Sequence, residues 1–510
     1  MAERADEKLL GDLAAGRDVV LTRRLPGDLE TPVSAYLKLA DQPWSALLES
    51  VEGGRVRGRY SIIGFAPDRL FRIRNGQAEL AVVDETAMPD VWRPVTQTPL
   101  QALRQFIDDA RMALTTDSPP MLGAVIGYLG YDMVREIEHL GAAPPDPYDV
   151  PGALFMRPTK MAIFDAVRDE ILLAVILRPD DSRIEAPARL ARARADLDAM
   201  EAALARPVPA AARWAAVPDS VQAGRQAVQA AVPPSRYAEM VMRAKEHIFA
   251  GDIFQVVLAQ RFSRPFTLPA FTLYRALRRL NPAPFLFFLR FGDFALTGSS
   301  PEILVRVQAG EVTIRPIAGT RPRGETRDED TRLAAELLAD PKERAEHLML
   351  LDLGRNDVGR VAVPGTVRVA ESFVIERYSH VMHIVSEVRG RLDTERADVI
   401  DALMAGFPAG TVSGAPKVRA MEIIDALEPE GRGPYAGAVG YFAPSGDMDS
   451  CIVLRTALVK DGWMHVHAGA GIVADSVPAR EQAECENKAR ALIRAAEIAE
   501  AAATGEATDR

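Results

Sequence analysis

Short segments of alternating apolar and polar residues fill the first third of the chain, and glycines separate these segments. The segments 60–64 and 70–74 follow this pattern, and Asn75-Gly76 directly follows the second of them. Alternation with a period of two is typical of strands that bury one face, and Asn-Gly favours a tight turn between two strands. The pattern predicts a strand-rich region over residues 19–177.

The composition and the hydrophobic period change twice in the remainder of the chain. Alanine and arginine dominate 186–205, which predicts an exposed helix, and prolines on either side of 220 complete a linker region over 178–234. The region 235–500 mixes both periods, and the Ala-rich tail 501–510 is predicted to be disordered. For the mixed region we predict helices at 237–250 and 327–357 and strands at 255–262, 285–291, 303–307, 312–316, 379–388, 436–442, 452–459 and 463–468.

The composition is that of a globular protein and argues against several classes of partner. The chain has 510 residues, of which 48% are hydrophobic and 26% charged, and a formal net charge of −10. This charge gives no electrostatic reason to expect nucleic acid or an acidic membrane surface as a partner. Two cysteines make neither a disulfide framework nor a zinc set, and apolar runs such as 171–177 are too short to cross a bilayer. The first residues are charged and unlike a secretory signal, so we expect a cytoplasmic protein.

Two pairs of glutamates, each three residues apart, occur near the starts of predicted helices. The first pair is Glu343 and Glu346, and the second is Glu481 and Glu484. This spacing places both carboxylates of a pair on one helix face. One carboxylate from each helix suits Mg²⁺, which favours one or two protein carboxylates, several waters and an anionic substrate. Considered singly, each pair is better explained by helix capping or by an exposed helix start.

Glycine-rich loops and two isolated polar residues offer further candidate chemistry. Backbone N–H groups in the loops 317–324, 407–417 and 468–473 can approach an anion closely, although tight turns between strands also explain these glycines. Arg455 lies inside one of the predicted strands, where its burial requires either a carboxylate ligand or an internal acidic partner. His383 is by default a hydrogen-bonded histidine of a strand, and its titration range also suits acid or base chemistry.

Five long motifs occur in a fixed order, and together they resemble one enzyme family. They begin at Pro316 (Pro-Ile-Ala-Gly-Thr-Arg-Pro-Arg-Gly), Lys342 (Lys-Glu-x-x-Glu-His-Leu-Met-Leu-x-Asp-Leu-x-Arg-Asn-Asp), Phe407 (Phe-Pro-Ala-Gly-Thr-Val-Ser-Gly-Ala-Pro-Lys), Tyr435 (Tyr-Ala-Gly-Ala-Val-Gly-Tyr) and Ala468 (Ala-Gly-Ala-Gly-Ile-Val-Ala-Asp-Ser). The chain resembles the chorismate-utilising enzymes, and within them the large subunits of anthranilate synthases, over roughly residues 19–497. The resemblance implies an α+β fold in which two large antiparallel β-sheets pack as a sandwich, with helices outside and the site in a cleft between the sheets.

The resemblance also implies a role for the residues at matching positions. Chorismate is the expected substrate, Mg²⁺ the expected cofactor and L-tryptophan the expected feedback inhibitor. Within the catalytic group, Glu343 is expected to protonate a departing hydroxyl and His383 to serve the elimination of pyruvate. The matching residues are Glu346 and Glu484 for the metal; His383, Glu343 and Thr411 for catalysis; Gly319, Thr320, Tyr435, Arg455, Gly469, Ala470 and Gly471 for substrate binding; and Glu49, Ser50, Pro284, Phe285 and Leu286 for tryptophan.

Two positions separate the members of this family. Sister enzymes that make aminodeoxychorismate carry a nucleophilic lysine where this chain has Ala318, and isochorismate-forming sisters carry a lysine base where it has Gln255. Neither residue supplies that chemistry, so ammonia is expected to add directly to chorismate and to give anthranilate and pyruvate. The chain contains no Gly-x-Cys-x-Gly sequence, so the ammonia is expected from a glutamine amidotransferase subunit in a hetero-oligomer.

Two alternatives stay open at this point. A large subunit of aminodeoxychorismate synthase is opposed by Ala318, and a catalytically inactive tryptophan sensor is opposed by the intact Glu346, Glu484 and His383. Without the resemblance, the segment 47–51 is simply a strand that ends in a turn.

Overall fold

The computed structural model describes residues 2–52, 56–83, 89, 91–179, 185–212, 214, 227–378 and 381–504, and strands and helices are mixed along all of them. None of the described helices is both long and apolar enough to cross a membrane. The strands are β1 Val19–Pro26, β2 Ser45–Glu52, β3 Val56–Arg74, β4 Gln77–Val82, β5 Arg93–Pro94, β6 Val125–Leu129, β7 Ala153–Asp165, β8 Glu170–Leu177, β9 Gln229–Ala230, β10 Gln255–Pro265, β11 Phe285–Arg290, β12 Phe294–Ser300, β13 Ile303–Gln308, β14 Glu311–Ile314, β15 Ile317–Pro322, β16 Arg368–Arg377, β17 Val381–Arg391, β18 Gly414–Ala415, β19 Ala438–Phe442, β20 Met448–Ile452, β21 Thr456–Lys460 and β22 Trp463–Ile472. The α-helices are α1 Ala2–Ala14, α2 Pro32–Leu39, α3 Pro99–Asp108, α4 Ala186–Leu204, α5 Pro234–Phe249, α6 Ala270–Leu280, α7 Arg327–Ala339, α8 Pro341–Gly359, α9 Val399–Gly406, α10 Lys417–Leu427 and α11 Pro478–Thr504.

Hydrogen-bonded pairing connects the described strands into one 22-stranded sheet, and the pairings are antiparallel. The predicted hairpin after residue 74 is confirmed, because Asn75 and Gly76, with φ angles of 52° and 72°, connect β3 to β4. Both residue types tolerate this left-handed conformation. The mixed helix and strand content and the antiparallel pairing agree with the expected class, whereas the two sheets expected of a sandwich are here joined into one by hydrogen bonds.

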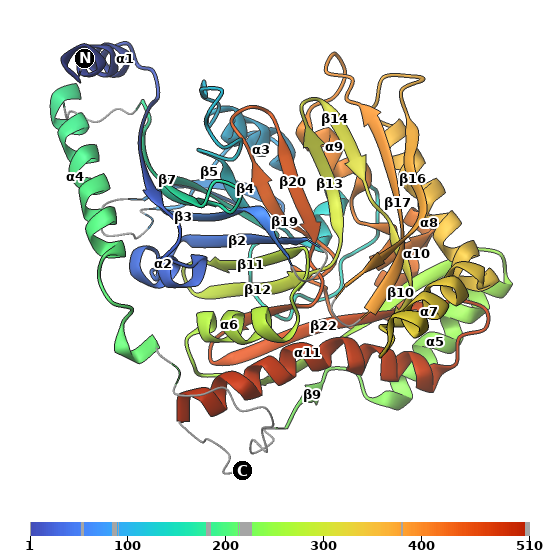
Figure 1. Ribbon diagram of the computed structural model, residues 1–510. Helices are drawn as coiled ribbons and strands as arrows, with labels where there is room; N and C mark the ends of the chain where they lie inside the picture. The colour runs from blue at the N-terminus through green and yellow to red at the C-terminus, as the bar shows by residue number, and fades with distance from the viewer. Residues whose placement is uncertain are drawn as a thin grey trace.

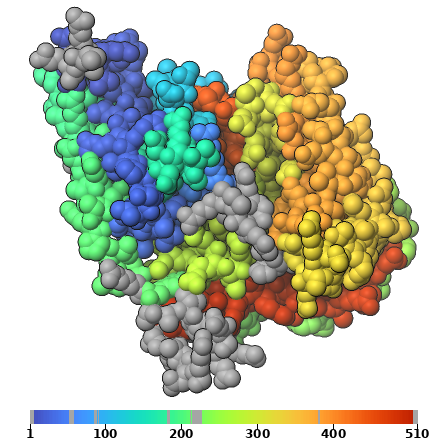
Figure 2. Space-filling view, in the orientation of Figure 1, coloured from blue at the N-terminus to red at the C-terminus, as the bar shows by residue number. Residues whose placement is uncertain are grey.

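Strands of the N-terminal third pair directly with strands of the C-terminal half. β2 pairs with β11 in the register Ser50↔Phe285, and β6 pairs with β19 in the register Leu129↔Ala438. Figure 1 shows the N-terminal strands on one side, β13, β14, β16 and β17 on the other, and β22 and α11 along the base beneath both. The space-filling view is hollowed between these two sides at the top (Figure 2). Above this base, β19 and β20 join the two groups of strands, because β19 pairs with β6 and β20 pairs with β13.

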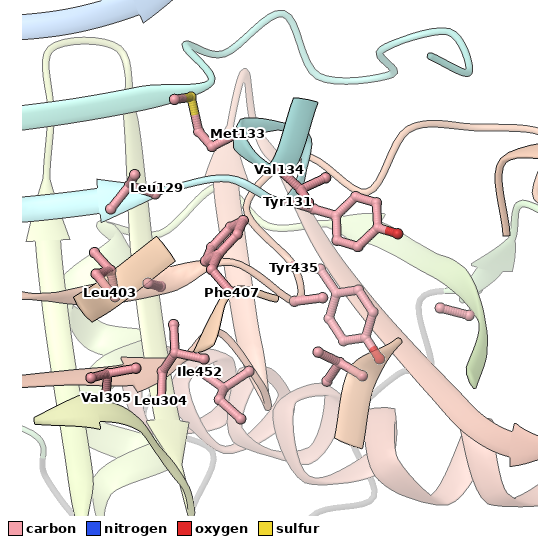
Figure 3. Close-up of a cluster of buried hydrophobic side chains, with 14 of the residues drawn as sticks. Leu129, Tyr131, Met133, Val134, Leu304, Val305, Leu403, Phe407, Tyr435 and Ile452 are labelled. Carbon is pink, nitrogen blue, oxygen red and sulfur yellow. The ribbon is translucent and has the colours of Figure 1, made fainter. Parts of the chain in front are cut away.

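One large apolar cluster fixes the elements of this base. Cys485, Ala489 and Leu492 of α11 are fully buried and belong to a cluster with apolar residues of β10 and β22. Figure 3 shows another part of the same cluster, which contains Phe407 and Tyr435. Burial of apolar surface is the main favourable term in folding, so this cluster holds α11 against the two strands.

The helix α4 corrects the prediction of an exposed helix over 186–205. Leu190, Ala193, Leu197 and Met200 are buried, and α4 packs against β8. These apolar residues recur every three or four positions, so they form one stripe on the helix. The abundance of alanine and arginine in the segment concealed this stripe.

Two other predicted segments differ from the structure. The predicted strand 452–459 breaks at Leu454 and Arg455, where β20 has ended and β21 has not begun. Arg455 has a φ of 47°, a left-handed conformation that a regular strand excludes. The helix α11 continues through Thr504, so the described part of the predicted tail is helical, and 505–510 lie outside the described residues.

A buried ion pair ties β10 to the segments that follow α10. Glu428 accepts hydrogen bonds from Arg432 Nε at 2.9 Å, from Arg432 Nη2 at 2.6 Å and from the N–H of Ala259 at 2.7 Å. The guanidinium group of Arg432 also donates to the carbonyl groups of Val412 and Val257. A buried charge is tolerated where its partners satisfy it in this way, so the pair fixes these backbone segments relative to one another.

Candidate active site

A cavity of about 580 Å³ opens where the turn before β11, the strand β17 and the helix α11 meet. The turn contributes small and apolar residues, and the strand and the helix contribute polar ones. The lining includes Asn281, Pro284, Tyr378, His383, Arg455, Glu484 and Lys488. The structure therefore brings His383, Arg455 and Glu484 to one cavity, although they come from distant segments of the sequence.

The loop that carries Gly319 and Thr320 holds the side chain of His383. Its Nδ1 lies 2.9 Å from the carbonyl oxygen of Gly319 and 3.1 Å from Thr320 Oγ1. Because a carbonyl group only accepts, this contact places the imidazole proton on Nδ1 and leaves the lone pair of Nε2 free. Burial lowers the pKa of His383, and the hydrogen bond to Gly319 opposes this effect. A neutral imidazole with a free Nε2 is suited to act as a base.

Glu343 lies beside the same loop, near the start of α8. Gly319 has a φ of 71°, and a side chain there would place its first carbon 3.0 Å from Glu343 Oε2. The glycine thus permits the close approach of α8 to the loop. Glu343 Oε1 accepts a hydrogen bond from Arg321 Nη1 at 3.2 Å, and the side chain of Asp340 caps the helix. The carboxylate of Glu343 is therefore already hydrogen-bonded to Arg321 within the protein.

Arg455 is a cation that has no anionic partner among the described residues. Among the residues that the structure describes, its guanidinium group makes no hydrogen bond or ion pair. Burial lowers the pKa of Arg455, and no neighbouring charge opposes this effect. Of the two partners that the sequence left open, an internal acid is wrong, and a ligand carboxylate remains because the side chain borders the cavity.

Glu346 of α8 and Glu484 of α11 approach each other from different helices. The pKa of Glu346 is raised by burial and by the negative charges of Glu343 and Glu484, while a hydrogen bond from Gln255 opposes the rise. Glu484 forms an ion pair with Lys488 at 2.7 Å. No group of three or more His, Cys, Asp or Glu side chains in the described ranges could hold a metal ion. Two mutually repelling carboxylates do fit Mg²⁺, whose other ligands are commonly water and substrate.

Gly469, Ala470 and Gly471 lie on an edge of β22 that no other described strand covers. β10 pairs with β22 along its full length, whereas the pairing of β21 with β22 stops at Val466. Lys488 of α11 donates to the carbonyl oxygen of Gly469 at 2.7 Å. The edge thus leaves backbone polar groups that could contact a ligand.

The missing side chains at Gly469 and Gly471 make room for two polar groups. A side chain on Gly469 would place its first carbon 2.9 Å from the hydroxyl of Tyr435, and one on Gly471 would place it 2.5 Å from Nε2 of Gln255. Burial raises the pKa of Tyr435, so its hydroxyl stays protonated and can donate a hydrogen bond. The predicted substrate-binding residues of this strand and Tyr435 therefore lie together.

Thr411 lies outside the lining of the cavity and contacts the carboxyl group of Glu302, which the sequence did not identify as a site residue. Thr411 Oγ1 is 3.2 Å from both carboxyl oxygens of Glu302, which is 6% exposed. Burial raises the pKa of Glu302 to about 8, and hydrogen bonds from Thr411 and the Ile317 N–H oppose the rise. Glu302 is thus protonated at neutral pH, next to the cavity residue Pro301. Its sequence signal is an acid between a proline and the start of a strand.

A second cavity, of about 330 Å³, separates β2 and β11 from β19 and β20. Ser50, Phe285 and Leu286, which the resemblance assigns to one pocket, line it together. Pro284, assigned to the same pocket, lines the larger cavity instead. Pro284 belongs to the turn before β11, which lines the larger cavity, whereas Phe285 and Leu286 belong to the strand.

Glu49 borders the second cavity, but its carboxylate group is turned toward α6. It accepts hydrogen bonds from the hydroxyl of Tyr274 at 2.6 Å and from Arg278 Nη2 at 2.9 Å. The charge of Glu49 is therefore already neutralised inside the protein. Glu49 therefore fixes β2, which lines the cavity, against α6.

Comparisons with known proteins agree on one family. A model of the chorismate binding enzyme family matches residues 84–494. Anthranilate synthase component 1 of Cereibacter sphaeroides is 50% identical over 488 residues, which cover 95% of this chain and 96% of that protein. The same component of Thermus thermophilus is 50% identical over 475 residues, which cover 93% of this chain and 97% of that protein.

Solved structures give the same result. Anthranilate synthase component I from Streptococcus pneumoniae has a TM-score of 0.73 at 35% identity and covers 92% of this chain and 99% of its own. A menaquinone-specific isochorismate synthase from Escherichia coli has a TM-score of 0.68 at 20% identity and covers 97% of this chain and 99% of its own. The second structure shares the fold.

The raised pKa of Glu302 predicts a dependence of stability on pH. Between about pH 4.5 and 8 the folded protein keeps a proton on Glu302 that the unfolded chain releases. The free energy of unfolding therefore falls with rising pH in this window, by up to about 1.4 kcal/mol per pH unit for this one group. Glu302→Gln removes this slope. The free energy of unfolding is measured with urea at about pH 5.5 and at about pH 7.5. Between these two pH values, that of Glu302→Gln is expected to rise by roughly 2 kcal/mol relative to that of the wild type.

The control is Glu325→Gln, which changes an exposed glutamate. It should leave the difference between the two pH values as in the wild type. Parallel pH dependences for Glu302→Gln and the wild type would show that Glu302 is ionised in the folded protein.

Proposed function

Because the chain belongs to the family of chorismate-binding enzymes, we propose that it is the large subunit of an anthranilate synthase, which converts chorismate and ammonia to anthranilate and pyruvate. This reaction is a lyase step of tryptophan biosynthesis. The observation that carries the proposal is the cavity that brings Arg455 and His383 beside the paired carboxylates. Ala318 and Gln255 also stand where the sister activities need a lysine.

Chorismate carries one carboxylate on its ring and another on its enolpyruvyl group, so it needs two anion-binding positions. Arg455 provides one, because its buried guanidinium group has no partner within the described chain. The uncovered edge of β22 at Gly469, Ala470 and Gly471 provides backbone groups for the other, next to the hydroxyl of Tyr435. Binding at two separate positions fixes the orientation of the ring and also contributes to the affinity for chorismate.

Glu346 and Glu484 would hold Mg²⁺ beside these positions. Their carboxylates come from α8 and α11. Burial and the negative charges of Glu343 and Glu484 raise the pKa of Glu346, and a divalent cation would oppose this rise. When bound, Mg²⁺ supplies positive charge that offsets the ring carboxylate of the substrate.

In the first half-reaction ammonia adds to carbon 2 of the ring. A carbon–nitrogen bond forms, the two ring double bonds shift, and the bond from carbon 4 to its hydroxyl breaks, so that this hydroxyl takes a proton and leaves as water. Glu302 suits the proton donor because burial keeps its carboxyl group neutral. Glu343, the donor that the resemblance implies, already accepts a hydrogen bond from Arg321. We therefore assign this proton to Glu302 in preference to Glu343.

In the second half-reaction the ring becomes aromatic. A base removes the proton from carbon 2, the bond from carbon 3 to the enolpyruvyl oxygen breaks, and the enolpyruvate takes a proton and leaves as pyruvate. His383 suits the base because Gly319 and Thr320 hold its Nδ1 side, which leaves Nε2 free. Its lowered pKa keeps the imidazole neutral and able to accept that proton.

The name component 1 of the relatives implies a second component. We propose that this partner is a glutamine amidotransferase that supplies ammonia and forms a hetero-oligomer with the chain in the cytoplasm. Ammonium in solution replaces this partner in an assay at alkaline pH, where part of it is unprotonated ammonia.

The second cavity suits a free amino acid with a large apolar side chain, and the proposal includes L-tryptophan as feedback inhibitor. Phe285 and Phe287 offer apolar contact, and Arg306 pairs with Asp449 at 2.8 Å on the same lining. The other carboxylate oxygen of Asp449, Oδ1, is buried and has no hydrogen-bond partner in the described residues. An ammonium group would satisfy it.

Product analysis tests the proposed activity directly. With chorismate, ammonium and Mg²⁺ at alkaline pH, the purified chain is expected to form fluorescent anthranilate and an equal amount of pyruvate, and EDTA is expected to stop both. Glu484→Gln should lower kcat/KM by about 100-fold or more, because a neutral amide is a poor ligand for Mg²⁺. The matched control is Glu481→Gln, one turn earlier on α11 and outside the cavity lining, which should keep most of the activity. Aminodeoxychorismate or isochorismate as the main product would reject the proposal.

His383→Ala should separate the two half-reactions. Addition of ammonia at carbon 2 does not need the imidazole, whereas removal of the carbon 2 proton does, so the amino intermediate should accumulate while anthranilate formation slows by about 100-fold or more. Chromatography of the quenched reaction measures both compounds. Anthranilate formation at the wild-type rate would remove His383 from the elimination step.

Ser50→Phe should relieve inhibition by L-tryptophan while leaving kcat/KM for chorismate within about twofold of the wild type. The aromatic ring of phenylalanine would fill part of a cavity that the catalytic groups do not line. The concentration of tryptophan for half inhibition, measured at fixed chorismate, should rise at least about tenfold, and Ser235→Phe on the exposed start of α5 should not change it. An unchanged value for Ser50→Phe would place the inhibitor elsewhere.

A further inference from the structure

Tyr435 lies along one face of β22, between a histidine and the strand edge proposed for a substrate carboxylate. Its ring stacks on the imidazole ring of His467, with the ring centroids 5.4 Å apart and an angle of 22° between the ring planes. Its hydroxyl lies over Gly469, where a side chain would place its first carbon 2.9 Å from the hydroxyl oxygen. His467 and Gly469 are two residues apart on β22 and therefore face the same side of the strand. The imidazole ring is thus the surface against which the ring of Tyr435 rests.

The hydroxyl of Tyr148, from the N-terminal third of the chain, fixes this imidazole ring. Tyr148 Oη lies 2.6 Å from Nδ1 of His467, and both side chains are buried. Burial and the positive charges of Arg432 and Arg261 lower the pKa of His467 well below its usual value. The imidazole is therefore neutral, and its hydrogen bond to Tyr148 holds the rotation of the ring in either tautomer.

Tyr148 is itself packed against the segment that precedes Tyr435. Gly433 has a φ of 54°, and a side chain there would place its first carbon 2.7 Å from the ring of Tyr148. The glycine therefore lets this ring approach the backbone closely. The N–H of Gly431 also donates to the carbonyl oxygen of Pro145 at 2.8 Å, so the segments that carry the two tyrosines are joined by their backbones.

We infer that Tyr148 and His467 are positioning residues, which hold the ring of Tyr435 so that its hydroxyl donates a hydrogen bond to a carboxylate of chorismate. The inference rests on the proposed function, which places that carboxylate at the edge of β22. Lys488, which lines the larger cavity, donates to the carbonyl oxygen of Gly469, so the edge lies beside that cavity. No described residue hydrogen-bonds to the hydroxyl of Tyr435, which leaves this donor for a ligand.

The position of this hydroxyl depends on the orientation of the whole ring, because the hydroxyl is at the far end of the side chain. Stacked aromatic rings prefer a defined offset, and a hydrogen bond weakens steeply as its angle departs from linearity. Loss of the stacking, or of the hydrogen bond that orients the imidazole, would therefore weaken the contact of Tyr435 with the carboxylate. That contact is the same before and during the chemical step, so its loss should raise KM for chorismate and leave kcat nearly unchanged.

The experiment measures kcat and KM for chorismate, at saturating ammonium and Mg²⁺, in Tyr148→Phe, in His467→Asn and in each of them combined with Tyr435→Phe. Phenylalanine at 148 keeps the ring and removes the hydrogen bond, whereas asparagine at 467 keeps an acceptor for Tyr148 and removes the stacked ring. Each single variant is expected to raise KM about three- to tenfold, with kcat within about twofold of the wild type. Tyr435→Phe alone should raise KM at least about tenfold, because a hydrogen bond to a charged group is lost. In the Tyr435→Phe background neither second change should alter KM more than about twofold, because the hydroxyl through which both act is gone.

The matched control is Tyr36→Phe, which removes the hydroxyl of another fully buried tyrosine. That hydroxyl lies 2.7 Å from Oγ of Ser45, and neither residue lines either cavity. Tyr36→Phe should leave both constants near those of the wild type. It therefore reports the general effect of removing a buried tyrosine hydroxyl from this protein.

Equal increases in KM with and without Tyr435→Phe would overturn the inference, because Tyr148 and His467 would then act independently of that hydroxyl. A wild-type KM in either single variant or in Tyr435→Phe, or the same rise in Tyr36→Phe, would overturn it as well. If Tyr148→Phe does not fold, His467→Asn alone provides the comparison. These outcomes leave the proposed function standing as long as the wild type forms anthranilate. A wild type that forms none would instead reject the proposed function.

Discussion

The break in the chain at Arg455 is the constraint on which the site depends. If β21 extended backward in its register with β22, Arg455 would lie opposite Ala468, and β21 would cover the edge that carries Gly469 and Gly471. The left-handed φ of 47° at Arg455 turns the chain away instead. The same turn frees the edge of β22 and brings the guanidinium group to the cavity. One backbone feature therefore creates both of the positions that we propose bind the carboxylates of chorismate.

The unfavourable groups of this site are concentrated where a ligand would satisfy them. Among the described residues, Arg455 is buried without an anion and Gln255 Oε1 is buried without a donor, and burial together with neighbouring carboxylates raises the pKa of Glu346. Each group stays in place because a rigid element holds it, and β10, β22 and α11 share one apolar cluster that supplies this rigidity. Groups that are fixed before the substrate arrives need little reorganisation when charge develops in the reaction. The cost in stability is offset by the core beneath the site.

The segment 281–286 lines both cavities, and it gives a physical route for the proposed regulation. Asn281 and Pro284 line the larger cavity, whereas Phe285 and Leu286 line the smaller one. Ser299 joins the segment to the site, because its hydroxyl donates to the carbonyl of Asn281 and its N–H donates to the carbonyl of Arg455. A ligand in the smaller cavity that favours one position of β11 would thereby shift residues of the larger cavity.

The sequence predicts these features unevenly, for physical reasons. The Asn75-Gly76 hairpin and the capped start of α8 are local, so short-range rules predict them. The break at Arg455 is not local, because its neighbours are apolar and β-branched and favour an unbroken strand, so tertiary packing overrides their propensity. The state of Glu302 likewise depends on Thr411 and on burial by distant segments, which no pattern around residue 302 contains.

The effect of chorismate on the stability of Arg455→Met, compared with the wild type, tests the proposed role of the Arg455 guanidinium group in this site most directly. Without ligand, the variant is expected to be at least as stable as the wild type, since methionine replaces a buried charge that no described residue pairs. Chorismate at about 100 times its dissociation constant should raise the free energy of unfolding of the wild type by about 2.7 kcal/mol, and that of the variant far less. A variant that is several kcal/mol less stable than the wild type without ligand, yet equally stabilised by chorismate, would show that Arg455 supports the fold and not the substrate.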